Sequence, residues 1–371
     1  MKMPKVLRIR SRLVSPRQGR PTRMGYAALA VAALLMAAPA AAAAATGESN
    51  DGGGTLSHHE FGVVNGTLYE YHVYTPVGWR GSDRLPLYMV LNGCGVSAAD
   101  MMEDTGLNTI ADRERFIVAY ADNEGAKPNC WPAVAEDAVL TASTGNPNLT
   151  RGAGGAADVV AGMTTQILEQ YHGNKHRVYL AGGSSGAFQA SATAAAYPEL
   201  YAAVGLVAGP GPGMAVTCMN YSPSVVADYA ALAVTAMGTQ ARVVPFITFG
   251  GTLDPLGEQP GDVGGCSGLG YQQWLAMANL VKPGSFYTDP EATEQGQVAD
   301  GYAWTKEVAK NRESGCEIGQ RWIIEGMGHT WPGPQGDQRG PDAAQLSWDF
   351  FEQFTRNGAS LSCRASGAGA E

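Results

Sequence analysis

The fold of this 371-residue chain follows from one segment, Val178-Tyr-Leu-Ala-Gly182-Gly-Ser184-Ser-Gly186-Ala-Phe188. The segment begins as a short apolar strand, continues as Gly-x-Ser-x-Gly and ends in a helix of small residues. This order is typical of a sharp turn that exposes a serine hydroxyl above a sheet. Larger side chains at Gly182 and Gly186 are expected to clash with neighbouring backbone. We therefore expect Ser184 to be a nucleophile.

Ser185 is the alternative nucleophile. A motif centred on it would use Gly183 as its first glycine but would place Ala187 where the second is needed. A bare Gly-x-Ser-x-Gly match arises readily by chance in a chain with 49 glycines. The flanking strand and helix make the match specific, and they favour Ser184.

The rest of the chain alternates short apolar runs with helix-like segments, which predicts a mostly parallel sheet with helices on both faces. The expected strands are Leu85–Leu91, Phe116–Tyr120, Arg177–Ala181, Ala203–Ala208, Val243–Phe249 and Arg321–Glu325, and the expected helices are Ala98–Arg113, Ala156–Tyr171, Ala187–Tyr197, Tyr271–Ala278 and Ala343–Phe354. Asn65-Gly66 predicts a hairpin turn within Phe61–Thr75. Residues 209–240 and 255–300 are expected to be irregular and to form walls or a lid of a site. Together with the serine turn, this pattern predicts a single-domain α/β-hydrolase fold over residues 61–363.

A serine nucleophile needs a base and a group that orients the base, and in α/β-hydrolases the chain order is Ser, acid, His. The chain has six histidines, and His329 alone follows Ser184. Asp254 directly follows the apolar run Val243–Phe249, where a carboxylate can reach the histidine ring. Other acids of this region stand in looser contexts: Asp228, Asp262 and Glu294. We expect Asp254 and His329 to complete a catalytic triad.

Acyl transfer also needs N–H donors for the developing oxyanion. One is expected from Ser185, the residue after the nucleophile, and the other from the loop Leu91–Gly95 after an early strand. Cys94 of that loop is an alternative nucleophile. No cysteine-protease signature surrounds it, which favours a disulfide instead.

Residues 1–45 predict a secretory signal peptide. They carry eight Lys or Arg and no acid, and an apolar stretch leads into an alanine-rich run. An uncleaved membrane anchor is the alternative, but the apolar part is short for a bilayer; translation could also begin at Met24. Cleavage would change the formal net charge from -9 to -17. Such an acidic protein is not expected to bind nucleic acid. Residues 46–60 are expected to form a flexible leader and 364–371 a flexible tail.

Six cysteines in an exported chain predict disulfides. They allow fifteen pairings, and pairing of sequential neighbours is the first hypothesis: 94–130, 218–266 and 316–363. The Cys and His spacings do not fit a zinc site. We expect neither a metal nor a cofactor.

With these residues in place, the chain resembles the polyhydroxybutyrate depolymerase-type esterases, which are related to feruloyl and acetylxylan esterases. The matching motifs are Pro86–Cys94, Asn129-Cys130-Trp131, Gly182–Gly186, Ala195–Pro198, Gly326–Gly333 and Ser347–Phe351. The resemblance implies that Cys94 supplies an oxyanion N–H, that Cys130 is its disulfide partner, and that Trp131 and Trp331 line the acyl groove. Asn92 stands where the family usually has histidine, which puts the hydrogen bonding of this loop in question.

These observations predict a secreted serine esterase that hydrolyses oligoesters or polyesters of the 3-hydroxybutyrate type. A feruloyl or acetylxylan esterase is the first alternative, and an inactive binding protein on the same scaffold is the second. About forty residues follow His329, from which we expect no additional polymer-binding domain and weak attack on crystalline polyester. The sequence leaves the oligomeric state open.

Overall fold

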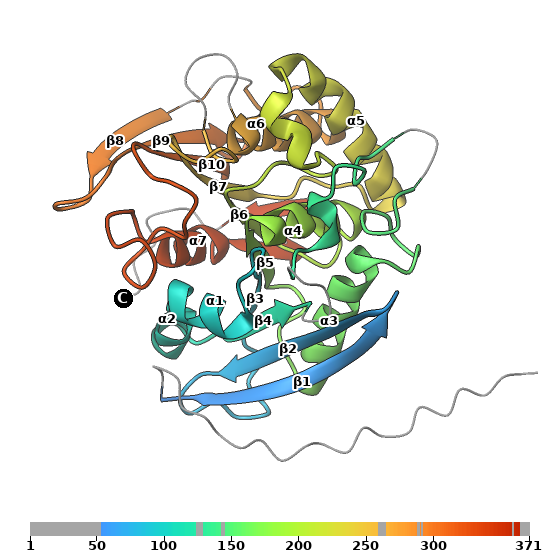
Figure 1. Cartoon of the computed structure of the whole chain (residues 1–371), viewed down its shortest axis with the longest axis vertical. Coiled ribbons are helices and arrows are strands. Elements are labelled where there is room, and N and C mark those ends of the chain that lie inside the picture. The colour runs from blue at the N-terminus through green and yellow to red at the C-terminus, as the bar shows by residue number, and fades with distance from the viewer. Residues whose placement is uncertain are drawn as a thin grey trace, which may run out of the picture. The chain divides into compact units, whose positions relative to one another are not determined.

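Strand pairing places the predicted serine turn near the middle of one large sheet. The strands are β1 (Thr55–Val64), β2 (Thr67–Thr75), β3 (Leu87–Leu91), β4 (Ile117–Asp122), β5 (Val178–Gly183), β6 (Ala203–Val207), β7 (Phe246–Gly251), β8 (Ala292–Gln297), β9 (Ala303–Lys310) and β10 (Glu317–Ile324). Their order is β1-β2-β4-β3-β5-β6-β7-β10-β9-β8 (Figure 1). The inner strands from β4 to β10 pair in parallel, and antiparallel strands flank them at both edges. A separate pair consists of β11 (Phe354–Asn357) and β12 (Ser360–Cys363).

The structure is a computed structural model and describes residues 53–363 apart from 124–128, 142–144, 259–264, 288–289, 291 and 358–359. The expected signal peptide (1–45), the first part of the expected leader (46–52) and the expected tail (364–371) lie outside the described residues. Within the described part of the chain, no helix is long and apolar enough to cross a membrane.

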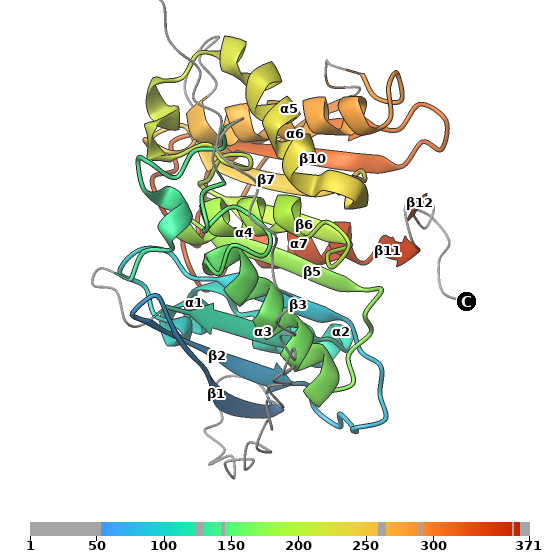
Figure 2. The same ribbon diagram turned by 90° about the vertical axis from the view of Figure 1, so that its right-hand side faces the viewer.

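Helices cover both faces of the sheet (Figure 2). They are α1 (Ala98–Thr105), α2 (Leu107–Glu114), α3 (Ala156–Gln170), α4 (Ser185–Ala196), α5 (Val226–Met237), α6 (Gly265–Val281) and α7 (Ala343–Phe351), with short 3-10 turns at Pro132–Val134, Val216–Asn220, Pro223–Val225 and Gly238–Gln240. Apolar residues of α3, α4, α5 and α6 share one core with one face of the sheet, and those of α1, α2 and α7 share a second core with the other. The predicted α/β-hydrolase class is confirmed.

Some elements differ from the sequence-based expectation. The helix expected over 98–113 is two helices, because Gly106 adopts a left-handed conformation with φ 59° between α1 and α2. The regions expected to be irregular contain α5, β8 and all of α6, which extends the helix expected over Tyr271–Ala278 in both directions. The expected flexible leader, residues 46–60, was given too late an end. Strand β1 begins at Thr55 and pairs along its length with β2. The turn predicted at Asn65-Gly66 is present, with positive φ at both residues.

Three disulfides are formed, and they are the predicted pairs of sequential neighbours: Cys94–Cys130, Cys218–Cys266 and Cys316–Cys363. The first joins the loop after β3 to the segment after β4. The second joins the segment between β6 and α5 to α6, and the third joins β12 to the residue before β10. Each bond therefore ties a surface segment to the sheet or to a helix that packs on it.

Candidate active site

Ser184 occupies a strained turn between β5 and α4. Its φ is 53° and its ψ is -123°, a conformation that few non-glycine residues adopt. A Cβ on Gly182 would lie 2.3 Å from the backbone of Gly186, and a Cβ on Gly186 would lie 2.2 Å from the carbonyl oxygen of Leu91. The turn therefore excludes any side chain at both glycines, as the sequence predicted.

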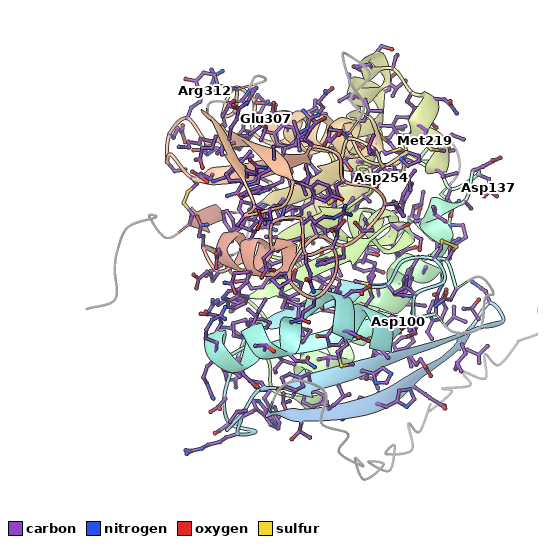
Figure 3. The ribbon with its side chains drawn as sticks, turned by 60° about the vertical axis from the view of Figure 1, so that its left-hand side comes forward. Asp100, Asp137, Met219, Asp254, Glu307 and Arg312 are labelled. Carbon is purple, nitrogen blue, oxygen red and sulfur yellow. A yellow bond between two sulfur atoms is a disulfide. The ribbon has the colours of Figure 1, made fainter. Side chains whose placement is uncertain are left out.

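The structure brings Ser184, His329 and Asp254 together from the carboxyl ends of three strands. The Ser184 Oγ lies 2.9 Å from His329 Nε2, and His329 Nδ1 lies 2.9 Å from both carboxylate oxygens of Asp254. Asp254, labelled in Figure 3, follows β7 and is fully buried. Its Oδ1 also accepts a hydrogen bond from the Leu256 N–H at 2.8 Å. With its proton on Nδ1, the neutral imidazole donates a hydrogen bond to the Asp254 carboxylate, and Nε2 can accept the serine proton.

The hydrogen bond from Asp254 raises the pKa of His329 above its usual 6.5, and this effect exceeds the opposing effect of burial. The imidazolium form is therefore stabilised where a proton from Ser184 would arrive.

The two segments with the expected oxyanion donors flank Ser184. Ser185 is the first residue of α4, so its N–H has no acceptor within the helix, and the positive end of the helix dipole lies here. On the opposite side is the Cys94 loop: a Cβ on Gly93 would lie 3.3 Å from the Ser184 Cβ. Cys94 and Ser184 line the same pocket. The two N–H groups expected to hold an oxyanion thus belong to segments on either side of the nucleophile.

Asn92 anchors this loop from below, and it is fully buried. Its Nδ2 donates to the Val96 carbonyl at 2.5 Å and to Asp122 Oδ1 at 3.3 Å, and its Oδ1 accepts from Trp131 Nε1 at 2.7 Å. Asp122 also accepts from the Ala98 N–H at 2.7 Å, which ties the loop to α1. The Asn92 amide thus forms hydrogen bonds with buried polar groups of this loop and its neighbours, at the position where the resembling family usually has histidine. The sequence analysis missed Asp122, although an acid at the carboxyl end of a buried strand was a visible signal.

Trp131 does not line the pocket, and the expectation that it does was wrong. Its side chain is fully buried, its ring lies 5.7 Å from that of Tyr69 in a tilted arrangement, and its Nε1 donates a hydrogen bond to Asn92. Trp131 contacts Asn92 of the Cys94 loop, and the neighbouring disulfide Cys94–Cys130 joins its segment to that loop.

We expect Trp131→Phe to lower both stability and kcat. The substitution leaves the buried Asn92 oxygen without its donor, which costs about 1–3 kcal/mol beyond the loss of packing. Trp274→Phe is the matched control, because Trp274 is equally buried and its Nε1 has no acceptor among the described residues. Urea denaturation and kcat on p-nitrophenyl butyrate measure both effects. Equal losses in the two variants would show that the Asn92 contact is unimportant.

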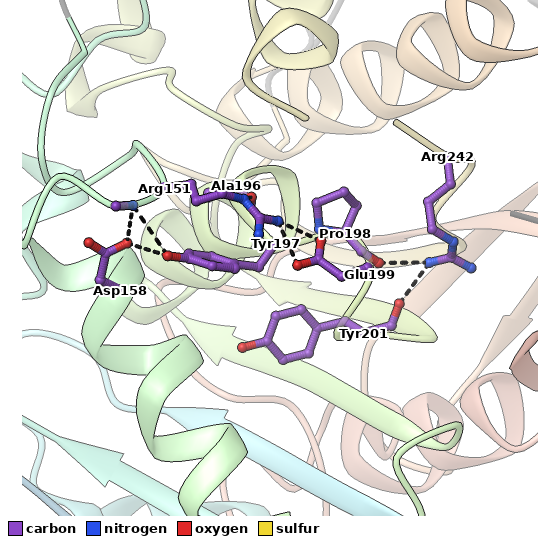
Figure 4. A network of polar contacts seen from close by, with 9 residues as sticks. Arg151, Asp158, Ala196, Tyr197, Pro198, Glu199, Tyr201 and Arg242 are labelled. Carbon is purple, nitrogen blue, oxygen red and sulfur yellow. Dashed lines mark hydrogen bonds and ion pairs between the residues drawn. The ribbon is translucent and has the colours of Figure 1, made fainter. Parts of the chain in front are cut away.

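The far end of α4 is fixed by a polar network (Figure 4). Buried Arg242 donates to the carbonyl oxygens of Pro198 and Tyr201 at 3.1 and 2.8 Å, and Arg151 pairs with Glu199. Burial, with a smaller effect of nearby Arg356, lowers the pKa of Arg242 to about 10. These bonds fix the connection between α4 and β6. They therefore also fix the end of the helix whose first turn follows Ser184.

A pocket of about 520 Å³ opens over Ser184. Its residues come from the Cys94 loop, α1, the serine turn, the end of β6 and the His329 loop: Gly93, Cys94, Val96, Met101, Asp104, Gly183, Ser184, Val207, Ala208, His329, Thr330, Trp331, Gly336 and Asp337. Trp331 lines the pocket as expected. None of these residues comes from the described parts of segments 209–240 and 255–300, so the structure does not support the expectation that they form its walls. The sequence analysis missed Met101, Asp104 and Asp337, which carry no motif.

The fold and the arrangement around Ser184 define the class: an α/β-hydrolase with serine, histidine and aspartate in triad geometry. The predicted family resemblance is confirmed, because residues 69–222 match the family described as esterase PHB depolymerase.

Among curated proteins, the chain is 30% identical over 168 residues to feruloyl esterase B of Thermothelomyces thermophilus, covering 44% of this chain and 52% of that protein. It is 32% identical over 111 residues to acetylxylan esterase A of Talaromyces purpureogenus, covering 30% and 26%. The chain thus spans about half the length of the first of these relatives and about a quarter of the second. The solved acetyl xylan esterase from Aspergillus awamori superposes with a TM-score of 0.57 at 20% identity, covering 80% of this chain and 99% of that one, which shows a shared fold.

Proposed function

We propose that this protein is a secreted serine esterase that hydrolyses neutral oligoesters of the 3-hydroxybutyrate type through an acyl-enzyme. One observation carries the proposal: the Ser184 hydroxyl lies 2.9 Å from a histidine whose other ring nitrogen contacts a buried carboxylate. This arrangement supplies the base and its orienting group, the two requirements for a serine nucleophile.

In the first step, Ser184 Oγ attacks the ester carbonyl carbon and His329 Nε2 takes the hydroxyl proton. The carbonyl oxygen becomes an oxyanion, which accepts hydrogen bonds from the N–H groups of Cys94 and Ser185. Asp254 holds the ring and stabilises the imidazolium. The carbon–oxygen bond of the ester then breaks, and His329 returns its proton to the departing alcohol.

In the second step, water attacks the acyl-enzyme and His329 takes a proton from it. The bond between the acyl carbon and Ser184 Oγ breaks, and the proton passes to Ser184. The products are a carboxylic acid and the free enzyme, and no cofactor takes part.

The pocket favours a neutral acyl group. Val96, Met101 and Trp331 provide apolar surface, and Asp104 places a carboxylate on the lining. Asp337 also lines the pocket, but its carboxylate is paired with Arg339 at 3.0 Å. A substrate with a free carboxylate beside the scissile bond would be repelled. We infer that cleavage occurs within an oligoester chain rather than at the unit that bears its terminal carboxylate.

A feruloyl or acetylxylan esterase is the second candidate. The curated relatives carry these names, and the family match covers only residues 69–222. A ferulate or acetyl ester is neutral too, so both candidates suit the same pocket.

Secretion is part of the proposal. The three disulfides are typical of proteins that fold in oxidising compartments. The predicted signal peptide provides the export route.

A substrate panel tests the function. Protein from residue 46 is assayed on hydroxybutyrate trimers with free and methylated carboxylates, amorphous polyhydroxybutyrate, methyl ferulate and acetylated xylan. A separate sample is titrated with a fluorophosphonate probe to count reactive serines. We expect stoichiometric labelling and the highest kcat/KM on the methylated trimer. A preference for methyl ferulate or acetylated xylan would support the second candidate function. Absence of labelling would favour an inactive binding protein.

The pH dependence follows from the raised pKa of His329. The base must be neutral, so kcat/KM should rise with pH through a midpoint above 6.5. Asp254→Asn removes the cause of the shift, so its midpoint should move to lower pH while kcat falls by about 10⁴-fold. The effect on folding has the opposite sign: protonated His329 stabilises the fold fully below about pH 6.5, and this contribution is lost as pH rises through the folded pKa. Equal midpoints in the two proteins would contradict the assigned role of Asp254.

A further inference from the structure

Three potential metal ligands gather on the hairpin at one edge of the sheet, apart from the serine site. His58 in β1 lies directly opposite His72 in β2, and Glu70 stands two residues before His72, so all three side chains share one face. One ligand atom from each lies within 4.8 Å of the others. His58 Nε2 is 3.1 Å from Glu70 Oε2, and the two imidazole rings have centroids 4.7 Å apart.

We propose that His58, Glu70 and His72 bind one Zn²⁺ ion, with water in the fourth position. Two imidazoles and a carboxylate are a donor set that zinc uses with bonds of about 2.0–2.2 Å. In a tetrahedral site such bonds place ligand atoms roughly 3.4 Å apart. His58 Nε2 and Glu70 Oε2, 3.1 Å apart, are already close to this value, and all three ligand atoms lie within 4.8 Å of one another. The site is open to solvent, since the side chain of His58 is 48% exposed.

The surroundings favour a cation. Glu60 lies opposite Glu70 in the hairpin, and Asp122 of β4 lies opposite Glu70 on its other side. These carboxylates add negative potential around the three ligands, in a chain with a net charge of -9. The contact between His58 Nε2 and Glu70 Oε2 uses only two of the three groups. A zinc ion uses all three groups at once.

The register of the strands creates this site. β2 is paired on both sides, with β1 and with β4, so the backbone at Glu70 and His72 is fixed before a metal arrives (Figures 1 and 2). Three strands, β2, β4 and β3, separate β1 from β5, which leads to Ser184. We therefore assign the ion a stabilising role at the sheet edge and no part in ester hydrolysis.

The test uses protein from residue 46, treated with chelator and dialysed, and titrated with ZnCl₂ alone by calorimetry. We expect one ion per chain and a higher Tm in its presence. His58→Ala and Glu70→Gln should each weaken binding by more than about tenfold. The matched control is His59→Ala, because His59 is adjacent in β1, points to the opposite face and contacts Tyr171; it should bind zinc as the wild type does.

Cobalt provides a second readout. Co²⁺ should give tetrahedral absorption bands with the wild type and with His59→Ala, and not with His58→Ala. Circular dichroism of each variant checks that the hairpin has folded. Equal zinc affinity in wild type and His58→Ala, or no binding by folded wild type, would overturn the proposal. Ester hydrolysis should be unchanged by zinc, so this outcome is independent of the proposed function.

Discussion

Ser184→Ala is expected to lower kcat on p-nitrophenyl butyrate by about 10⁴–10⁶-fold, the range found when a serine nucleophile is removed. The substitution deletes the atom that lies 2.9 Å from His329 Nε2. It leaves the helix N-terminus and the Cys94 loop in place, so KM and Tm should change little. Residual activity would come from oxyanion stabilisation and binding.

Ser191→Ala is the control for this variant. Ser191 lies in α4, the helix that follows Ser184, is fully buried, and its Oγ has no partner among the described residues. It should retain wild-type kcat. Ser184→Ala and His329→Ala should not be additive, because the two residues act in one proton transfer. If Ser184→Ala keeps a tenth of the activity, the nucleophile has been misassigned.

Gly186→Ala is expected to lower kcat by at least about 100-fold and to lower the Tm as well. The new methyl group would lie 2.2 Å from the Leu91 carbonyl oxygen and 2.5 Å from that of Asn92, and neither backbone group can rotate away. The serine turn and the oxyanion loop must therefore separate. A displacement of about 1 Å in such a site costs on the order of 100-fold in rate.

Gly183→Ala is the matched control, three residues earlier in the same motif. Its Cβ would meet only the Trp331 ring, at 3.4 Å, which is an ordinary contact. We expect a change in Tm of a few degrees and nearly normal kcat. Circular dichroism and kcat on p-nitrophenyl butyrate compare the two variants. Similar behaviour of both would show that the close approach at Gly186 is not needed.

The sequence alone predicted the parts of the molecule that depend on local geometry or on chain order. The Gly182–Gly186 motif specified the turn, because only glycine fits where backbone meets backbone within one strand–helix unit. Chain order then led to His329 and Asp254, which the structure places within hydrogen-bond distance of each other. Apolar runs located the parallel strands. Pairing of sequential cysteines was one hypothesis among fifteen, and the structure forms those three bonds.

The tertiary structure decided what depends on contacts between distant segments. No local pattern shows that Trp131 turns inward to Asn92 or that Asp104 and Asp337 reach the pocket. Likewise, the spacing of Cys and His residues along the sequence does not fit a zinc site. The register of β1 and β2 nevertheless brings His58 beside Glu70 and His72. Side chains on paired strands become neighbours through backbone hydrogen bonds, so their spacing is set across the sheet rather than along the chain. The sequence thus determined the reacting groups, and packing determined the pocket and the surface around them.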